Sequence, residues 1–182
     1  MKAITPLTIE NAPEDSQPIM EMATKKYSFL PNLLGNMAHA PAMLKGYATL
    51  SGIFGETSFS STEQQIVLMS NNLLNGCKYC MAAHTTIAQG QGVAGDVIEA
   101  LRNDTPIEDA KLEALRQFSH VINESRGNPS GAQTEAFLAA GYNGANILEV
   151  ILGTALKVMS NYTNHVTETP VDDNFVANSW TA

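Results

Sequence analysis

The sequence predicts an all-α protein with a single domain of about seven to eight helices. Apolar residues recur at helical spacing through most of the chain, and several of these stretches are preceded by residues typical of helix N-caps. No segment alternates polar and apolar residues convincingly enough to indicate a strand. The 182 residues suffice for one domain, and no repeat or long linker divides them.

The first helices follow an irregular lead-in, which we expect over residues 1–14. A helix is expected from about Ser16 to Tyr27, with Pro18 in the first turn, where its missing N–H costs nothing. The turn-rich segment FLPNLLGNMAHAP allows one short helix. A clearer helix is expected over about 42–54.

The central helices carry strong start and stop signals. Two overlapping capping boxes begin at Ser60 and Ser61, before an apolar stretch that ends at Asn75-Gly76. The chain then restarts as a helix, which we expect over about 77–89.

Two further helices are expected in the next segment. A short one covers about 94–102. A long one runs to about Ser125, with Thr105 as its N-cap and Pro106 at its first position.

The C-terminal part is expected to add two helices. One covers about 132–140, and an apolar helix then begins at Asn143 or Asn146 and continues to about Asn164. Residues 170–182 are expected to form a tail.

Composition excludes several classes of function. Ten Lys and Arg against 18 Asp and Glu give a net charge of −8, which repels phosphate backbones and anionic lipid, so neither nucleic acid nor a membrane surface is an expected partner. The sequence shows no secretory signal, and no apolar run reaches the roughly 20 residues of a membrane span. We expect a cytoplasmic protein. No motif for a nucleotide cofactor is present, so no cofactor is predicted.

The two cysteines, Cys77 and Cys80, are the most informative residues, because the chain has no others. On a helix, Cys77, Cys80 and His84 are spaced i, i+3 and i+7 and share one stripe. Two such cysteines can close a disulfide with little backbone movement. The pattern predicts thiol redox chemistry, in which one thiolate is oxidised and the second sulfur closes a disulfide.

Spacing alone does not decide which sulfur attacks. The start of the helix favours a thiolate at Cys77, because unpaired N–H groups and the helix dipole stabilise negative charge there. Proximity to His84 favours Cys80 instead. Two other interpretations compete with redox chemistry. One is a pair of inert buried thiols, and the other is a zinc site that includes His84, although no second Cys or His pair lies nearby to complete it.

The stretch EQQIVLMSNNLLNGCKYCMAAHTTIA resembles the signature of the carboxymuconolactone decarboxylase-like superfamily, in its AhpD-like alkylhydroperoxidase branch. The resemblance extends to FLPNLLGNMAHAPAMLKGY and to NYTNHVTETPVDDNF, which is similar to the tail of peroxidase-related members, and covers about residues 28–176. It implies a helical AhpD-like fold assembled into homotrimers or homohexamers. It also implies organic hydroperoxides as substrates and a thiol or dithiol as reductant.

The same resemblance implies roles for individual residues. Cys80 is the attacking cysteine, Cys77 resolves the oxidised sulfur, and His84 helps to deprotonate Cys80. Two positions depart from the pattern. The relay glutamate of the family, twelve residues before the first cysteine, is Gln65 here, and a second relay histidine is Tyr79.

Neither departure supplies a base. Gln65 cannot accept a proton at neutral pH, and the phenol of Tyr79, with a pKa of about 10, is a poor base. Glu63 lies about 200° around the helix from Gln65, so it is no simple substitute. The expected relay is incomplete, which predicts weak peroxidase activity or a different thiol or disulfide substrate. A lactone decarboxylase and a non-catalytic redox-sensing oligomer remain the alternatives.

Overall fold

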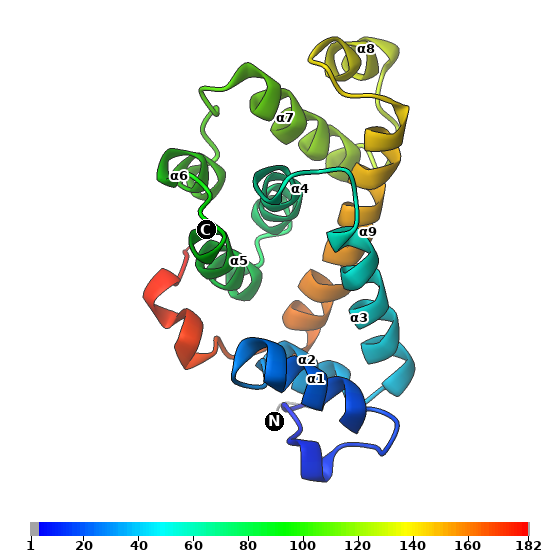
Figure 1. Cartoon of the computed structure of the whole chain (residues 1–182), viewed down its shortest axis with the longest axis vertical. Helices are drawn as coiled ribbons and strands as arrows, with labels where there is room; N and C mark the ends of the chain where they lie inside the picture. The colour runs from blue at the N-terminus through cyan, green and yellow to red at the C-terminus, as the bar shows by residue number, and fades with distance from the viewer. Residues whose placement is uncertain (1–3, 182) are drawn as a thin grey trace.

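The computed structural model describes residues 4–181, and within that part of the chain all regular structure is helical. The predicted all-α class is therefore confirmed. Figure 1 shows an elongated molecule in which α9 (Gly144–Thr167) runs along one side beside α3 (Pro41–Gly55), while α4 (Ser61–Leu74) and α5 (Lys78–Gly90) lie within. Among residues 4–181, eight α-helices have nine residues or more.

The remaining elements are η1 (Ile9–Asn11), α1 (Gln17–Tyr27), α2 (Asn32–Met37), α6 (Gly95–Asn103), α7 (Ala110–Glu124), α8 (Gly131–Ala139) and η2 (Asp173–Asn178), where η denotes a 3-10 helix.

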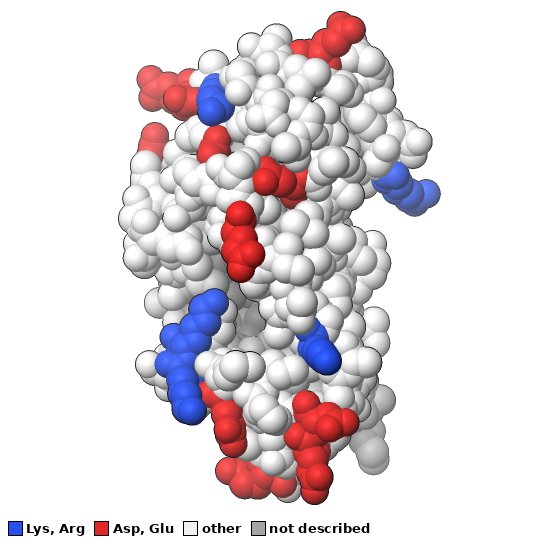
Figure 2. Space-filling model, turned by 45° about the vertical axis from the view of Figure 1, so that its right-hand side comes forward, with Lys and Arg blue, Asp and Glu red and all other residues white. Residues whose placement is uncertain are grey.

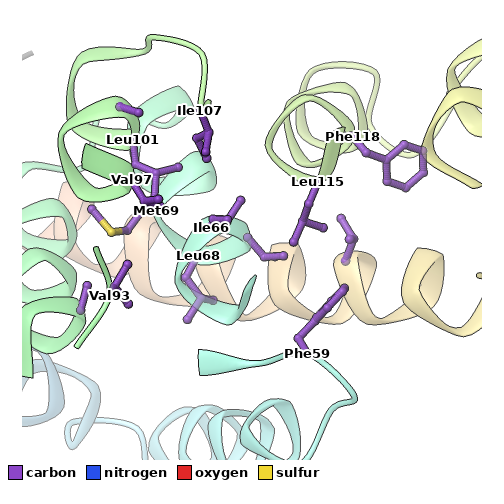
Figure 3. Close-up of a cluster of buried hydrophobic side chains, with 14 of the residues drawn as sticks. Phe59, Ile66, Leu68, Met69, Val93, Val97, Leu101, Ile107, Leu115 and Phe118 are labelled. Atoms are coloured by element: carbon purple, nitrogen blue, oxygen red, sulfur yellow. The ribbon is translucent and has the colours of Figure 1, made fainter. Parts of the chain in front are cut away.

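Helix α4 is central and packs against α5, α6, α7 and α9. It begins at one of the two predicted capping boxes: Ser60 Oγ accepts the N–H of Glu63 at 3.3 Å, and the Glu63 carboxylate accepts the N–H of Ser60 at 2.9 Å. Farther along, Ile66 is fully buried, and Figure 3 shows it pointing between Leu101 of α6 and Leu115 of α7. A helix surrounded in this way positions both of its ends firmly.

Helix α7 begins later than predicted. Its N-cap is Asp109, whose carboxylate accepts two backbone N–H groups of the first turn at 2.9 Å. The prediction of Thr105 as N-cap and Pro106 as first helical residue is wrong. Ile107 is buried in this loop, and its N–H donates to Glu113 at 2.8 Å. The chain thus places an apolar side chain in the core before the helix can begin.

Both asparagines at the start of α9 take part in its cap. Asn143 is the N-cap and accepts the N–H of Ala145 at 2.8 Å, while Asn146 accepts the N–H of Asn143 at 3.0 Å. The helix continues to Thr167, so Asn164 belongs to it and is buried.

The C-terminal segment, expected as a tail, is packed against the helices as far as residue 181, with residue 182 outside the described part. Helix η2 packs on α5, Phe175 is buried, and Trp180 Nε1 donates to the carbonyl of Arg102 at 2.9 Å. Figure 1 shows this segment beside α5. At the other end, the expected irregular lead-in contains η1, and residues 1–3 lie outside the description.

The surface carries no large patch of one charge on the face drawn in Figure 2, where acidic and basic side chains are scattered. Between residues 4 and 181, no helix alone has the length and apolar character to cross a bilayer. Helices α8 and α9 meet that criterion together, but with a bend of 110° between them.

The contact of α9 with α3 and α4 depends on Gly153. A Cβ at this position would lie 2.6 Å from Val67 Cγ1 and 2.7 Å from Phe54 Cε2, and both side chains are buried. We expect Gly153→Ala to lower the free energy of unfolding by about 1–3 kcal/mol through overpacking. Chemical denaturation would measure it.

Gly52→Ala is the matched control. Gly52 is exposed on α3 and has open space around it, so the same change should raise stability by about 0.5–1 kcal/mol through helix propensity. Equal effects at the two glycines would contradict the close packing of α9.

Candidate active site

The two cysteines lie where α4 ends and α5 begins. Gly76 adopts a left-handed φ of 63° that reverses the chain, and Cys77 follows as the extended N-cap of α5, with Cys80 in the first turn. The predicted position of the pair near a helix start is confirmed. Both cysteines are free and buried, with 1% and 2% of their surfaces exposed.

The surroundings of the two sulfurs differ. Asn164 Nδ2 donates to Cys80 Sγ at 3.1 Å and lies 3.7 Å from Cys77 Sγ. Burial raises the pKa of Cys80, but hydrogen bonds from Cys77 and Ser160 and the charge of Lys157 outweigh it and lower the pKa to about 5. The hydrogen bond to Cys80, burial and the charge of Cys80 raise the pKa of Cys77. The site therefore favours a thiolate at Cys80 and a protonated Cys77.

His84 lines the same pocket as Cys80, and both of its ring nitrogens have partners. Its Nδ1 lies 2.9 Å from Oε1 of Gln65, whose own amide nitrogen donates to Gln91 at 3.0 Å. Nδ1 therefore carries the proton and donates it to Gln65. Nε2 lies 3.1 Å from Nζ of Lys157 and accepts from it. Burial, followed by the charge of Lys157, holds the pKa of His84 well below its usual value, so the ring is neutral.

Sequence reasoning missed Lys157, which is 1% exposed. Helix α9 contains two Asp, Glu, Lys or Arg residues, and these are Glu149 and Lys157. It lies on the same buried stripe as Gly153 and Asn164. A lone lysine on the buried stripe of an apolar helix was the available signal, because lysine is almost never fully buried without a partner.

Buried asparagines brace the turn that carries the cysteines. Asn72 accepts the N–H of Cys77 through its carbonyl at 2.9 Å and donates its side-chain amide to the carbonyl of Cys80 at 3.2 Å. Asn161 donates to Asn72 at 3.1 Å and accepts from Asn75 at 2.8 Å. The network joins α9, which carries Lys157, to the end of α4. Hydrogen bonds therefore fix the position of α9 relative to the cysteines.

Tyr79 links two distant segments. Its hydroxyl donates to Asp172 at 2.6 Å and accepts the N–H of Leu33 at 3.4 Å. Burial and the nearby carboxylate raise the pKa of Tyr79, so the phenol stays protonated. Asp172 also accepts the N–H of Asn32 at 3.0 Å. Tyr79 therefore fastens the C-terminal segment to α2 and forms part of the pocket wall.

Glu63 lies apart from the cysteines. Its carboxylate caps α4, accepts the hydroxyl of Tyr142 at 3.1 Å and pairs with Lys111 at 3.7 Å. The structure thus places His84 and Tyr79 in one pocket with Cys80, holds Gln65 against His84, and leaves Glu63 with Tyr142 and Lys111.

Cys80 and His84 open into a small pocket between α1, α2, α3, α5 and η2. The cavity volume is about 80 Å³, which corresponds to roughly two or three waters at about 30 Å³ each. The aromatic side chains that line it are Tyr27, Tyr47, Tyr79 and Phe175. Such a site accommodates a small, largely apolar molecule with its reactive group at the sulfur.

The residues at the sulfurs do not suit a metal ion. Over the described range 4–181, no three His, Cys, Asp or Glu side chains form a group that could hold one. The two nitrogens of His84 are taken by Gln65 and Lys157, and a cation bound by the cysteines would be repelled by the Lys157 ammonium.

Comparisons with known proteins agree with this geometry. Residues 41–119 match the model of the carboxymuconolactone decarboxylase family. No curated protein matches the chain. A peroxidase-related protein from Ralstonia eutropha JMP134, described as an alkylhydroperoxidase AhpD core, superposes with a TM-score of 0.83 at 17% identity over 96% of both chains.

Two further solved structures share the fold. A peroxidase-related protein from Silicibacter sp. TM1040 gives a TM-score of 0.80 at 20% identity, covering 96% of this chain and 95% of its own. The debrominase Bmp8, as a C82A variant in complex with 2,3,4-tribromopyrrole, gives 0.81 at 17% identity, covering 98% and 96%. The predicted AhpD-like fold is confirmed, and the match of residues 41–119 supports the predicted resemblance to the carboxymuconolactone decarboxylase family.

The role of Tyr79 as a fastening residue is testable. We expect Tyr79→Phe to lower the free energy of unfolding by about 1–3 kcal/mol, because the buried carboxylate of Asp172 loses its hydroxyl donor and keeps the N–H of Asn32. The pH dependence of Cys80 alkylation should stay as in the wild type. A displaced alkylation profile in Tyr79→Phe would instead place the phenol in proton transfer.

Proposed function

We propose that this protein is a thiol-dependent oxidoreductase that reduces small hydroperoxides, with Cys80 as the attacking and Cys77 as the resolving residue. One observation carries the proposal: the sulfur on the pocket wall, that of Cys80, receives the shorter hydrogen bond from Asn164 and has its pKa lowered, whereas the pKa of Cys77 is raised. A thiolate is the reactive form of cysteine, and this arrangement stabilises it at neutral pH. The AhpD-like fold supports the same conclusion.

The reaction takes place in two steps. The Cys80 thiolate attacks the terminal oxygen of ROOH, the O–O bond breaks, and the sulfur becomes a sulfenic acid while the leaving alkoxide takes up a proton to give ROH. Cys77 then attacks the oxidised sulfur, a disulfide forms, and the hydroxyl leaves as water with the proton of Cys77. An external thiol or dithiol reduces the disulfide by exchange. The cavity of about 80 Å³ favours small hydroperoxides.

The aromatic lining of the pocket supports a second candidate, the reductive removal of a halogen from a small ring. Two thiols and an aryl bromide would yield a disulfide, the dehalogenated ring and hydrogen bromide. The structural likeness to the debrominase Bmp8 fits this chemistry, whereas the small cavity favours the hydroperoxide. Bromide release, measured beside hydroperoxide consumption, separates the two.

The hydroperoxide proposal predicts distinct behaviour of the two cysteine variants. One equivalent of a small alkyl hydroperoxide should convert the wild type to a Cys77–Cys80 disulfide, measured by mass spectrometry. Cys80→Ser should lose consumption entirely, and Cys77→Ser should stop after one equivalent as a sulfenic acid. Full turnover by Cys80→Ser would refute the assignment.

The pKa of Cys80, lowered to about 5, also fixes the pH dependence of the first step. The thiolate is present above that value and lost below it, so the rate of sulfenic acid formation should be flat from neutral pH down to about 6. It should fall about tenfold for each pH unit below the pKa. A rate that rises up to pH 8 or 9, as for an ordinary thiol, would contradict the stabilised thiolate.

We also propose that copies of this chain associate through the outer face of α9. The exposed apolar residues of that face follow heptad-like spacing, and they are Leu148, Ile151, Ala155, Val158, Tyr162 and Val166. Val166 is 80% exposed and Leu148 68%. A stripe with this period is complementary to a second copy of itself, which agrees with the expected homotrimer or homohexamer.

Charge on this stripe should dissociate the assembly. We expect Val158→Glu to shift the molar mass, measured by light scattering, toward the monomer, because a carboxylate would be buried between apolar helices. Met22→Glu, at a methionine that is 61% exposed on α1, is the matched control and should leave the mass unchanged. A monomeric wild type would contradict this interface.

A further inference from the structure

We propose that Lys157 is the residue that holds Cys80 as a thiolate and sets how oxidising the cysteine pair is. In this arrangement His84 is the hydrogen-bond acceptor that positions Lys157, and it is not the base that deprotonates Cys80. The inference rests on the thiol chemistry proposed above and identifies what controls it.

The positive charge of Lys157 is buried and needs a partner. Its ammonium is 1% exposed and is hydrogen-bonded to the neutral ring of His84. None of the ion pairs found over residues 4–181 joins an Asp or Glu to it. An isolated ammonium is too costly to bury. Lys157 acts electrostatically on both cysteine sulfurs. Cys80 receives the shorter hydrogen bond from Asn164, at 3.1 Å, so its thiolate is the counterion.

The lone pair of His84 points toward Lys157. Because Nδ1 donates to Gln65, the lone pair is on Nε2, and Nε2 faces Lys157 at 3.1 Å. To remove a proton from Cys80, that lone pair would have to face the sulfur. Among the hydrogen bonds of the described residues, none joins His84 to either cysteine. The proton of Cys80 therefore passes to solvent, and the hydrogen bond from Cys77 together with the charge of Lys157 stabilises the thiolate that remains.

Gln65 fits this arrangement better than a glutamate would. A carboxylate at this position would hold a proton on His84 and favour the imidazolium, which would place a second cation 3.1 Å from the ammonium. The neutral amide fixes the tautomer without adding charge. Its orientation is set by the hydrogen bond to Gln91.

Other ionisable groups do not replace Lys157. The groups that face Cys80 or share its pocket are Cys77, His84 and Lys157, together with Tyr27, Tyr47 and Tyr79. Burial raises the pKa of both Tyr47 and Tyr79, which remain neutral. The carboxylate of Asp172 is bound by Tyr79. Lys157 is thus the cation available to the thiolate within the described part of the chain.

The pairing has a redox consequence. Disulfide formation consumes the thiolate and leaves the ammonium without its counterion, so Lys157 stabilises the reduced pair relative to the disulfide. A dithiol with a stabilised reduced form is a stronger oxidant. Lys157 therefore makes the pair easier to reduce by an external thiol.

The test compares Lys157→Met, Lys157→Arg and His84→Gln in the full chain with both cysteines. Thiolate formation is followed by thiolate absorbance and by alkylation of Cys80 as a function of pH, without hydroperoxide. The wild type should show a midpoint of about 5. Lys157→Met should raise the midpoint by about two pH units. Lys157→Arg, which keeps the charge, and His84→Gln, which keeps an acceptor, should stay within one unit of the wild type.

The redox arm measures the equilibrium of each variant with glutathione. Lys157→Met should favour the disulfide about 100-fold more than the wild type, which is about 60 mV for a two-electron couple. Lys157→Arg, which keeps the charge, should leave this equilibrium within about threefold of the wild type. A general loss of packing at this position would shift the equilibrium further. Circular dichroism verifies folding.

Two results would overturn the proposal: an unchanged midpoint in folded Lys157→Met, or a midpoint raised by two units in His84→Gln. If Lys157→Met does not fold, the His84→Gln titration still decides the question. None of these measurements uses a peroxide. A protein with the expected titrations that consumes no hydroperoxide would therefore refute the proposed substrate and leave the role of Lys157 intact.

Discussion

A lysine ammonium buried within α9 is the constraint on which the rest of the site depends. Burial of Lys157 requires an anion and an acceptor at fixed positions, and these are Cys80 and His84 on α5. Both partners come from a different helix, so α9 must lie against the start of α5 in one register. Gly153, one turn before the lysine, permits the close approach that this register needs.

The fold meets this requirement by placing the site between two apolar clusters. One is built around α4, α6 and α7, and the other around α1, α2 and the cysteine turn. Helix α5 contributes residues to both, and asparagines of α4 and α9 lie beside its start. The hydrogen bonds of Asn72, Asn75 and Asn161 specify a geometry more strictly than apolar contacts do. The cysteine turn is therefore held rigid on the protein side, while η2 and the aromatic residues form the wall that faces substrate.

Sequence alone identified the features that are local in the chain. The capping box at Ser60, the start of the last helix at Asn143 or Asn146, and the stripe of Cys77, Cys80 and His84 follow from local residue patterns. Thr105 was misassigned because the burial of Ile107, a tertiary contact, delays the helix that a good N-cap and a proline would otherwise begin. Lys157 and Asn164 lie about 80 residues from the cysteines, and no periodicity reveals such contacts. Nor does spacing show which nitrogen of His84 faces which partner, since Gln65 decides it.

The departures from the family pattern at positions 65 and 79 are better explained together with Lys157 than as losses. A relay of carboxylate and histidine moves protons and therefore depends on pH in the range where its histidine titrates. Here the imidazole is neutral because the pKa of His84 is held well below its usual value, and the Lys157 ammonium beside it stabilises the thiolate. Gln65 is then required to be neutral, and Tyr79 is free to fasten the C-terminal segment through Asp172. The same fold can thus support thiol chemistry by fixed charge instead of proton relay, and the change needs one lysine on the facing helix.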